Sequence, residues 1–206
     1  MSPTLVVIFA KAPQAGRVKT RLAASIGALE AERLYKRLLE RTIATALSAR
    51  CGPVELHGMP RDHALLRAIA LRNRIALRSQ SAGDLGTKMG SAFRQGLRSH
   101  RKMVLIGCDC PALDVRDLRR AARLLSGCDA VLSPAEDGGY PLIGLSRCTP
   151  RLFDDMKWST PTVIGDTRHR LRELGWTWRE LRTLWDVDRL EDLERLRSAN
   201  LLARRP

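Results

Sequence analysis

Apolar residues along this chain fall into two patterns: short unbroken runs, and longer stretches in which they recur every three or four positions. Short runs bounded by turn residues predict strands, and the longer repeat predicts helices with one apolar face. The runs predict strands at residues 5–10, 54–59, 75–77, 103–107, 130–132, 142–145 and 178–184. The repeats predict helices at residues 29–49, at 62–71, after 86, at 114–125, from about 158 and after 188.

Three of these predicted helices carry a start signal in the sequence. Asp62 and Asp114 stand where a carboxylate can cap the first turn of a helix. Ser159-Thr160-Pro161 combines a hydroxyl at the cap with proline in the first turn. We therefore expect helices to begin directly after these three positions.

Strands and helices alternate through about the first 130 residues, which favours a right-handed, mostly parallel sheet. After Asp137 the pattern is less regular, and we expect an antiparallel strand in the C-terminal third. No linker, internal repeat or low-complexity tract interrupts the 206 residues. The sequence therefore predicts a single α/β domain over residues 1–206.

The composition is that of an ordinary globular protein, with 44% hydrophobic and 28% charged residues. The sequence has no run of 18 apolar residues, so we expect no membrane-spanning helix. The first apolar run is short and lacks a preceding basic segment, so we expect no signal peptide and a cytoplasmic location.

The formal net charge of +14 raises the question of a nucleic-acid partner. The cations, however, are spread along the whole chain and few aromatic residues lie among them. A solvated, arginine-rich surface accounts for this charge, and an anionic small molecule would use the same field. We do not expect nucleic acid to be the main partner.

Cysteine and histidine positions exclude several kinds of site. The five cysteines form no C-x-x-C pair, and their odd number argues against a disulfide framework or a structural zinc site. The four histidines show no spacing for a metal or a catalytic triad. No G-x-S-x-G motif is present, which argues against an α/β-hydrolase.

The first strand leads into a basic loop that contains Gly16 and four cations: Lys11, Arg17, Lys19 and Arg21. A buried strand followed by such a loop and then a helix is a common phosphate-binding arrangement in α/β sheets. The loop does not match G-x-x-x-x-G-K-[ST], and no G-x-G-x-x-G occurs anywhere in the chain. We therefore expect the side-chain cations to bind phosphate together with the backbone.

Acidic residues follow several other predicted strands, namely Asp109, Glu136 with Asp137, and Asp186 with Asp188. Ligands of open α/β sheets bind beyond the carboxyl ends of the strands. Carboxylates facing a cationic loop are suited to a hard cation such as Mg²⁺, which keeps several waters and bridges to substrate phosphates. Each acid also has a structural alternative: a strand end for Asp109, a turn for Asp137 and a helix cap for the last pair.

A specific combination of motifs spans nearly the whole chain. It consists of Phe9–Pro13, Gly16–Leu22, Gly83-Asp84-Leu85-Gly86, Gly107–Pro111, Asp137–Tyr140 and Asp186–Asp188. In this order and spacing the chain resembles the DUF2064 family of bacterial nucleotide-diphospho-sugar transferase-like proteins, often labelled glycosyltransferases. It is more distantly similar to molybdenum cofactor guanylyltransferase and 2-phospho-lactate guanylyltransferase.

The resemblance implies a GT-A fold, a three-layer α/β/α sandwich with a nucleotide site at the strand ends. It implies Mg²⁺ or Mn²⁺ at Asp109 and the Asp186–Asp188 segment, and it places the loop cations on the phosphates. We expect nucleotide or phosphate contacts from Lys11, Gly16, Arg17, Lys19, Arg21, Gly83, Asp84 and Lys88. Cys108, Lys88 and Pro141 depart from the family pattern, and Pro141 lies on the acceptor side.

Two transfer reactions fit this arrangement. Glycosyl transfer from a nucleotide sugar is the reaction that the family label implies, whereas four loop cations also suit the triphosphate of a nucleotidyl transfer. In both reactions Asp109 and Lys19 would act on the donor, and Asp137 would bind a small-molecule acceptor or serve as general base. A non-catalytic protein that binds anions or nucleic acid is the alternative of another class.

Overall fold

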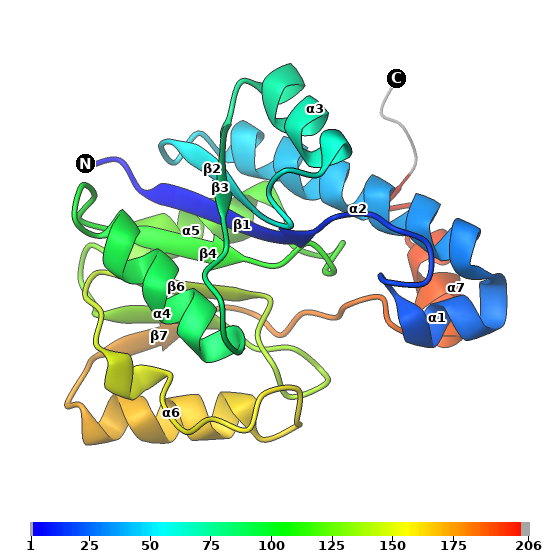
Figure 1. Cartoon of the computed structure of the whole chain (residues 1–206). Helices are drawn as coiled ribbons and strands as arrows, with labels where there is room; N and C mark the ends of the chain where they lie inside the picture. The colour runs from blue at the N-terminus through cyan, green and yellow to red at the C-terminus, as the bar shows by residue number, and fades with distance from the viewer. Residues whose placement is uncertain (1, 203–206) are drawn as a thin grey trace.

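The first apolar run forms the central strand β1 (Leu5–Lys11). Strands β2 (Val54–Met59) and β4 (Met103–Ile106) pair with β1 in parallel, one on each side. The computed structural model describes residues 2–202 and shows a seven-stranded sheet (Figure 1). The outer strands are β3 (Ala76–Ser79), β5 (Ala130–Ser133), β6 (Leu142–Leu145) and β7 (Trp178–Glu180).

The strand order is β3-β2-β1-β4-β6-β5-β7. Only β6 runs antiparallel, and it pairs with β4 on one side and with β5 on the other. The remaining pairs are parallel, including β5 with β7. The prediction of a mostly parallel sheet with one antiparallel strand in the C-terminal third is therefore confirmed.

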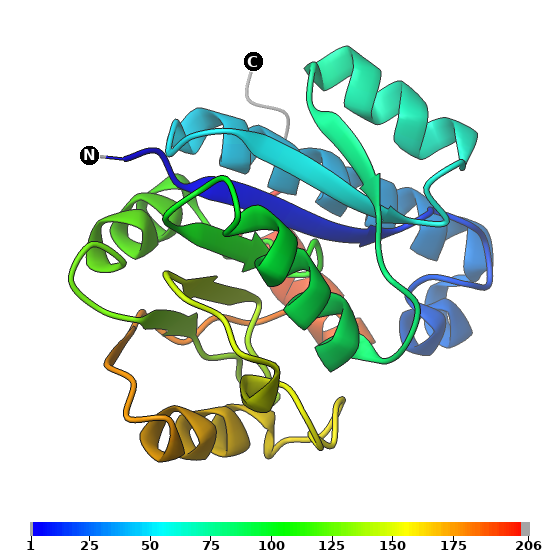
Figure 2. The ribbon, with the colours of Figure 1, turned by 60° about the vertical axis from the view of Figure 1, so that its left-hand side comes forward.

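Successive side chains of β1 enter two different cores, as expected for a strand that is buried on both faces. Val6, Ile8 and Ala10 pack toward helices on one face, whereas Leu5 and Val7 pack toward helices on the other. The first layer contains α2 (Ala28–Ala49), α3 (Ala64–Asn73) and α5 (Val115–Leu124). The second layer contains α4 (Leu85–Gly96), η1 (Pro150–Leu152) and α6 (Val163–Glu173), and Figure 2 shows α4 in front of the sheet.

Two short helices, α1 (Thr20–Ile26) and α7 (Leu190–Ser198), extend this sandwich at one end (Figure 1). Leu22 of α1 and Leu193 and Leu196 of α7 share a small buried cluster with Leu34 and Leu38 of α2. The sequence pattern predicted a helix after residue 188, where α7 lies, but it gave no range for α1, because the predicted helix began at residue 29. This cluster holds the loop after β1 and the segment before α7 against the same support.

The helix start signals were right in one case of three. Asp114 caps α5 by accepting from the Arg116 and Asp117 backbone N–H groups. Asp62 does not cap α3, because residues 60–63 form a turn and the N-cap is His63. Helix α6 begins at Val163, later than predicted, because Thr160 donates its hydroxyl to Lys157 O in the preceding turn.

Membrane-spanning helices and disulfides were not expected from the sequence. Within residues 2–202, no helix is long and apolar enough to cross a membrane. The cysteines at positions 51, 108, 110, 128 and 148 are all free thiols.

Candidate functional site

A cavity of about 570 Å³ lies where β1, β2 and β4 end at the carboxyl edge of the sheet. Its walls come from the loop after β1, the start of α1, helix α4 and the segment before α7. Seven of the predicted site residues line it: Lys11, Arg17, Lys19, Arg21, Lys88, Asp109 and Asp188. The fold therefore brings the basic loop and two of the acidic positions to one place.

Lys19 lies between the two acids that share this cavity. Its Nζ is 2.9 Å from Asp109 Oδ1 and 2.9 Å from Asp188 Oδ1. The Lys19 side chain is only 3% exposed, whereas the two carboxylates are 48% and 39% exposed. The ammonium is thus covered by protein, and the carboxylates remain accessible from the cavity.

The backbone of Lys19 contributes to this placement. Lys19 is the N-cap of α1 and has φ 48° and ψ 43°, in the left-handed region that few non-glycine residues adopt. Such a conformation costs of order 1–3 kcal/mol and persists only where the surroundings impose it. The ion pairs with Asp109 and Asp188 supply that constraint.

Backbone hydrogen bonds align the two acids. Val187 N donates to Asp109 O at 3.1 Å and so attaches the segment before α7 to the end of β4. The N–H groups of Asp188 and Arg189 both donate to Asp192 Oδ2. Asp192 therefore accepts the backbone N–H groups at the start of α7, and the Asp188 carboxylate accepts from Lys19 instead. The alternative that Asp188 caps the last helix is wrong.

The electrostatics of the site follow from this crowding of charge. Burial disfavours the charged form of Lys19, but Asp109 and Asp188 outweigh it and raise the pKa of Lys19 above its ordinary value. Burial, with the charges of Asp188 and Asp137, raises the pKa of Asp186 to about 6. The cavity therefore holds a permanent cation, Lys19, and the neighbouring Asp186 has a pKa raised toward neutral pH.

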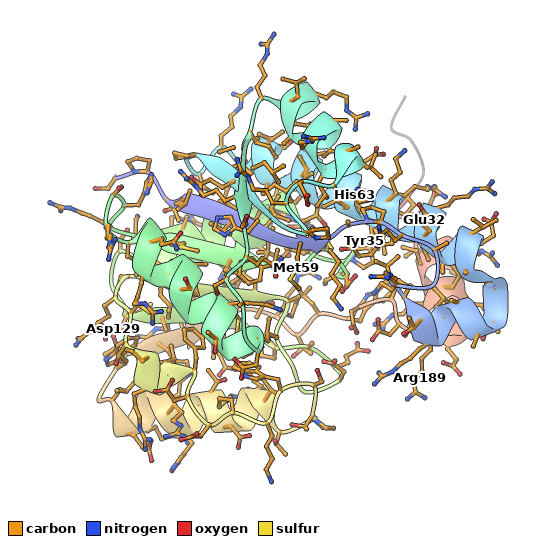
Figure 3. The ribbon with its side chains drawn as sticks, viewed as in Figure 1. Glu32, Tyr35, Met59, His63, Asp129 and Arg189 are labelled. Carbon is orange, nitrogen blue, oxygen red and sulfur yellow. The ribbon has the colours of Figure 1, made fainter. Side chains whose placement is uncertain are left out.

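Tyr35 of α2 supports the site, and no motif in the sequence indicates this role. Its hydroxyl accepts from Lys11 N at 2.9 Å and donates to Lys11 O at 3.2 Å. Cys108 Sγ also donates to this hydroxyl at 3.1 Å, and burial raises the pKa of Cys108 to about 12. Figure 3 labels Tyr35 and Met59 near the end of β1. Tyr35 therefore fixes the ends of β1 and β4 relative to each other.

Five predicted site residues do not line the cavity: Gly16, Gly83, Asp84, Asp137 and Asp186. Gly16 and Gly83 occupy turns with φ of 73° and 103°. Asp84 accepts from Thr87 N at 2.8 Å and so caps α4. Asp137 is exposed and accepts from Gly139 N at 2.9 Å, as in an ordinary turn.

The turn around Asp137 nevertheless lies close to the start of α6. A Cβ at Gly138 would come within 2.1 Å of Pro161 O, so only glycine fits there. Gly138 also has φ of 87°, and its carbonyl accepts from Ile164 N at 2.9 Å. This packing holds the Asp137 backbone next to residues 160–164. The charge of Asp137 also contributes to the raised pKa of Asp186.

A protein-family model described as "Uncharacterized protein conserved in bacteria (DUF2064)" matches residues 42–160, more than half of the chain. The chain belongs to the DUF2064 family.

Solved structures give a consistent picture of the fold of this DUF2064 protein. A Desulfovibrio desulfuricans G20 protein, named as a nucleotide-diphospho-sugar transferase, is 29% identical with a TM-score of 0.88, covering 97% of this chain and 88% of that one. CMP:2-keto-3-deoxy-manno-octonic acid synthetase, solved in complex with CTP, is 12% identical with a TM-score of 0.62, covering 96% and 98%.

Rv0371c from Mycobacterium tuberculosis H37Rv, in a complex with manganese, is 19% identical with a TM-score of 0.59 and covers 95% and 98%. The two structures of lower identity show the shared fold alone. No curated protein is significantly similar in sequence. With the Desulfovibrio neighbour, these similarities place the DUF2064 protein among the transferases of the GT-A-like fold.

The acidic residues of the DUF2064 site offer oxygen donors of the kind that a divalent cation needs. Among residues 2–202, no three His, Cys, Asp or Glu side chains are arranged to hold a metal. However, Mg²⁺ typically needs only one or two carboxylates besides water and substrate phosphates, and Mn²⁺ prefers the same oxygen donors. Asp109 and Asp188 supply those oxygens, and the buried Asp109 Oδ1 receives no hydrogen bond of normal geometry. Asp109 and Asp188 therefore fit such an ion. In this structure the Lys19 ammonium lies between their carboxylates.

Several other cavity residues were also missed from the sequence. Gln80, Met59 and Ser159 line the cavity although none belongs to a charged motif. Gln80 falls in the predicted loop after the third strand, and position in that loop was the only signal available for it. Leu85 also lines the cavity and belongs to the Gly83-Asp84-Leu85-Gly86 motif.

Proposed function

We propose that this DUF2064 protein transfers a group from a nucleotide-activated donor, with glycosyl transfer from a nucleotide sugar as the leading reaction. The observation that carries the proposal is the Lys19 ammonium held by Asp109 and Asp188 in a cavity lined by further cations. Acids and bases in contact at the carboxyl edge of an α/β sheet are suited to a nucleotide phosphate.

The phosphates of the donor would bind to the cations of the cavity. Lys11, Arg17 and Lys88 line it and form no ion pair within residues 2–202. Arg21 Nη1 lies 3.8 Å from Asp188 Oδ2, so its charge is only partly compensated. Cations aimed at the departing phosphate stabilise the charge that develops there, and one such contact is typically worth about 10²–10³ in rate.

Asp109 and Asp188, with Asp186 beside them, are the proposed ligands of Mg²⁺ or Mn²⁺. Such an ion, when bound, would supply charge neutralisation for the leaving phosphate. Lys19 would then leave its position between the carboxylates and donate to a donor phosphate oxygen. In this proposal Lys19 and Asp109 act on the donor. The carboxylates of Asp109 and Asp188 would bind Mg²⁺ or Mn²⁺.

The acceptor side is assigned to the turn that carries Asp137. Its Oδ1 is taken by Gly139 N, and the carboxylate is otherwise exposed. Asp137 would bind an acceptor hydroxyl or remove its proton, the two roles open to a carboxylate at this position. Pro141, which follows Tyr140 here, shapes the same side.

Nucleotidyl transfer is the second candidate. Five cations line the cavity, more than a diphosphate needs and a number suited to a triphosphate. In that reaction the α-phosphate would be attacked and pyrophosphate would leave.

Product analysis separates the two candidates. The protein would be incubated with nucleotide sugars or with nucleoside triphosphates, with Mg²⁺ or Mn²⁺, and phosphorus NMR would identify the products. Nucleoside diphosphate formed from a nucleotide sugar supports glycosyl transfer, and pyrophosphate formed from a triphosphate supports nucleotidyl transfer. Failure of every nucleotide to bind or react would contradict the proposal.

A further inference from the structure

The side-chain amide of Gln80, directly after β3, is held in one orientation. Its Nε2 donates to His57 O at 2.8 Å and to Ala10 O at 3.2 Å. Both partners are carbonyl oxygens, which only accept hydrogen bonds, so only the NH₂ end of the amide fits there. The Oε1 end makes no hydrogen bond within residues 2–202 and is not fully buried. Gln80 therefore presents a fixed acceptor.

Gln80 lines the same cavity as Lys19, and apolar residues line it as well. Phe9, Met59 and Leu85 are among the apolar side chains that line it together with Gln80. Met59 ends β2, and Gln80 N donates to Gly58 O of that strand at 3.4 Å. Ligand sites commonly combine apolar walls with a few oriented polar groups that set specificity. A nucleobase, flat and uncharged with polar edges, matches this combination better than phosphate does.

We infer that Gln80 Oε1 selects the nucleobase of the donor by accepting a hydrogen bond from an exocyclic amino group. This inference rests on the proposed function, because it requires a nucleotide in the cavity. Cytosine, adenine and guanine carry such an amino group, whereas uracil and thymine present a carbonyl oxygen in the corresponding place. Two facing oxygen acceptors cannot bond, and the fixed amide cannot invert without losing both bonds to β1 and β2.

The discrimination should be substantial because the acceptor is already oriented. A ligand that leaves an oriented hydrogen-bonding group of the site unpaired binds much more weakly. An apolar site discriminates less strongly between ligands that differ slightly in shape. We expect a preference of about ten- to a hundredfold in Kd for a base with the amino group over its oxo counterpart.

The test compares ligands that differ in one exocyclic group. Calorimetric titration of the wild-type protein with Mn²⁺ would give the Kd ratios for CDP against UDP, for ADP against IDP and for GDP against IDP. We expect the amino-bearing member of at least one pair to bind about tenfold tighter or more. Gln80→Leu should abolish that ratio. Gln95→Leu is the matched control, because Gln95 is exposed on α4, outside the cavity, and bonds only Ser91 Oγ.

The outcomes are distinguishable. If UDP binds as tightly as CDP, and IDP as tightly as both ADP and GDP, the inference is wrong while the proposed function stands. If no nucleotide binds, the proposed function fails and the inference fails with it. The wild-type comparison decides the question even if Gln80→Leu does not fold, since it needs no variant.

Discussion

Lys19 and Asp188 are 169 residues apart in the sequence, and Lys19 Nζ donates a 2.9 Å hydrogen bond to Asp188 Oδ1. The bond joins the loop after the first strand to the entry of the last helix. The Lys19 side chain is 3% exposed, so solvent screens this contact less than it screens a surface ion pair. The same ammonium also lies 2.9 Å from Asp109 Oδ1, which makes Lys19 the link between three segments of the chain.

Replacement of this lysine should lower stability. Lys19→Met leaves Asp109 and Asp188 facing each other without their cation, and we expect the free energy of unfolding to fall by about 1–2 kcal/mol. The carboxylates are partly exposed, so the loss should be below that for a fully buried pair. Urea denaturation in the presence of a chelator measures it. Lys36→Met is the control, since Lys36 is exposed on α2 and should change stability by less than about 0.5 kcal/mol.

The same variant should bind metal more readily. The Lys19 ammonium lies where a divalent cation would bridge the two carboxylates, so without nucleotide it competes with that ion. We expect Lys19→Met to bind Mn²⁺ about tenfold tighter than the wild type, measured by the loss of the free Mn²⁺ electron paramagnetic resonance signal. Asp109→Asn should abolish the binding in both backgrounds. Unchanged Mn²⁺ binding in Asp109→Asn would show that the metal site is elsewhere.

The carboxyl edge of the sheet was predictable from the sequence because it depends on local patterns. The unbroken apolar run of β1 and the acid after β4 place Lys11 and Asp109 at strand ends in any parallel arrangement. The order of the other elements, apart from α1 and η1, could likewise be predicted from alternating runs and repeats. These features depend on periodicity, which a single sequence displays directly.

The detailed contacts of the site could not be predicted in the same way. Tyr35 lies in the middle of a helix among apolar residues, and nothing in its own segment indicates the contact with Cys108, 73 residues away. The ammonium of Lys19 between two acids depends on the left-handed conformation of its backbone, which the sequence does not mark. Asp84 was predicted to contact the nucleotide, but its carboxylate accepts from Thr87 N and caps α4. The sequence alone does not distinguish these two roles of an aspartate before a helix.

A matched pair of tyrosine substitutions tests the support beneath the site. Tyr35→Phe leaves Lys11 N and the Cys108 thiol without their acceptor, and we expect the free energy of unfolding to fall by about 1–3 kcal/mol. The hydroxyl of Tyr140 is also buried, but it has no hydrogen-bond partner within residues 2–202. Tyr140→Phe should therefore be neutral or slightly stabilising. Equal losses in both variants would contradict the role given to Tyr35.

Arg17 provides a test of donor binding with little effect on the fold. It is exposed, lines the cavity and has no ion pair within the described chain. Arg17→Ala should raise the KM for the donor about tenfold while the denaturation midpoint stays the same, because only a phosphate contact is lost. Steady-state kinetics with a saturating acceptor measures this. An unchanged KM would remove Arg17 from the phosphate site.

The pH dependence of stability should report Asp186. Its pKa is raised to about 6 in the folded protein, so the folded chain holds this proton more tightly than the unfolded chain does. The stabilisation that this gives is complete below about pH 4, the ordinary range of an aspartate, and is lost as the pH rises through about 6. Asp186→Asn stays neutral at every pH. With metal chelated, it should exceed the wild type in stability by about 1 kcal/mol at pH 8, and the gain should vanish below about pH 4. A gain that is the same at both pH values would mean that burial and the neighbouring charges of Asp188 and Asp137 do not raise the pKa of Asp186.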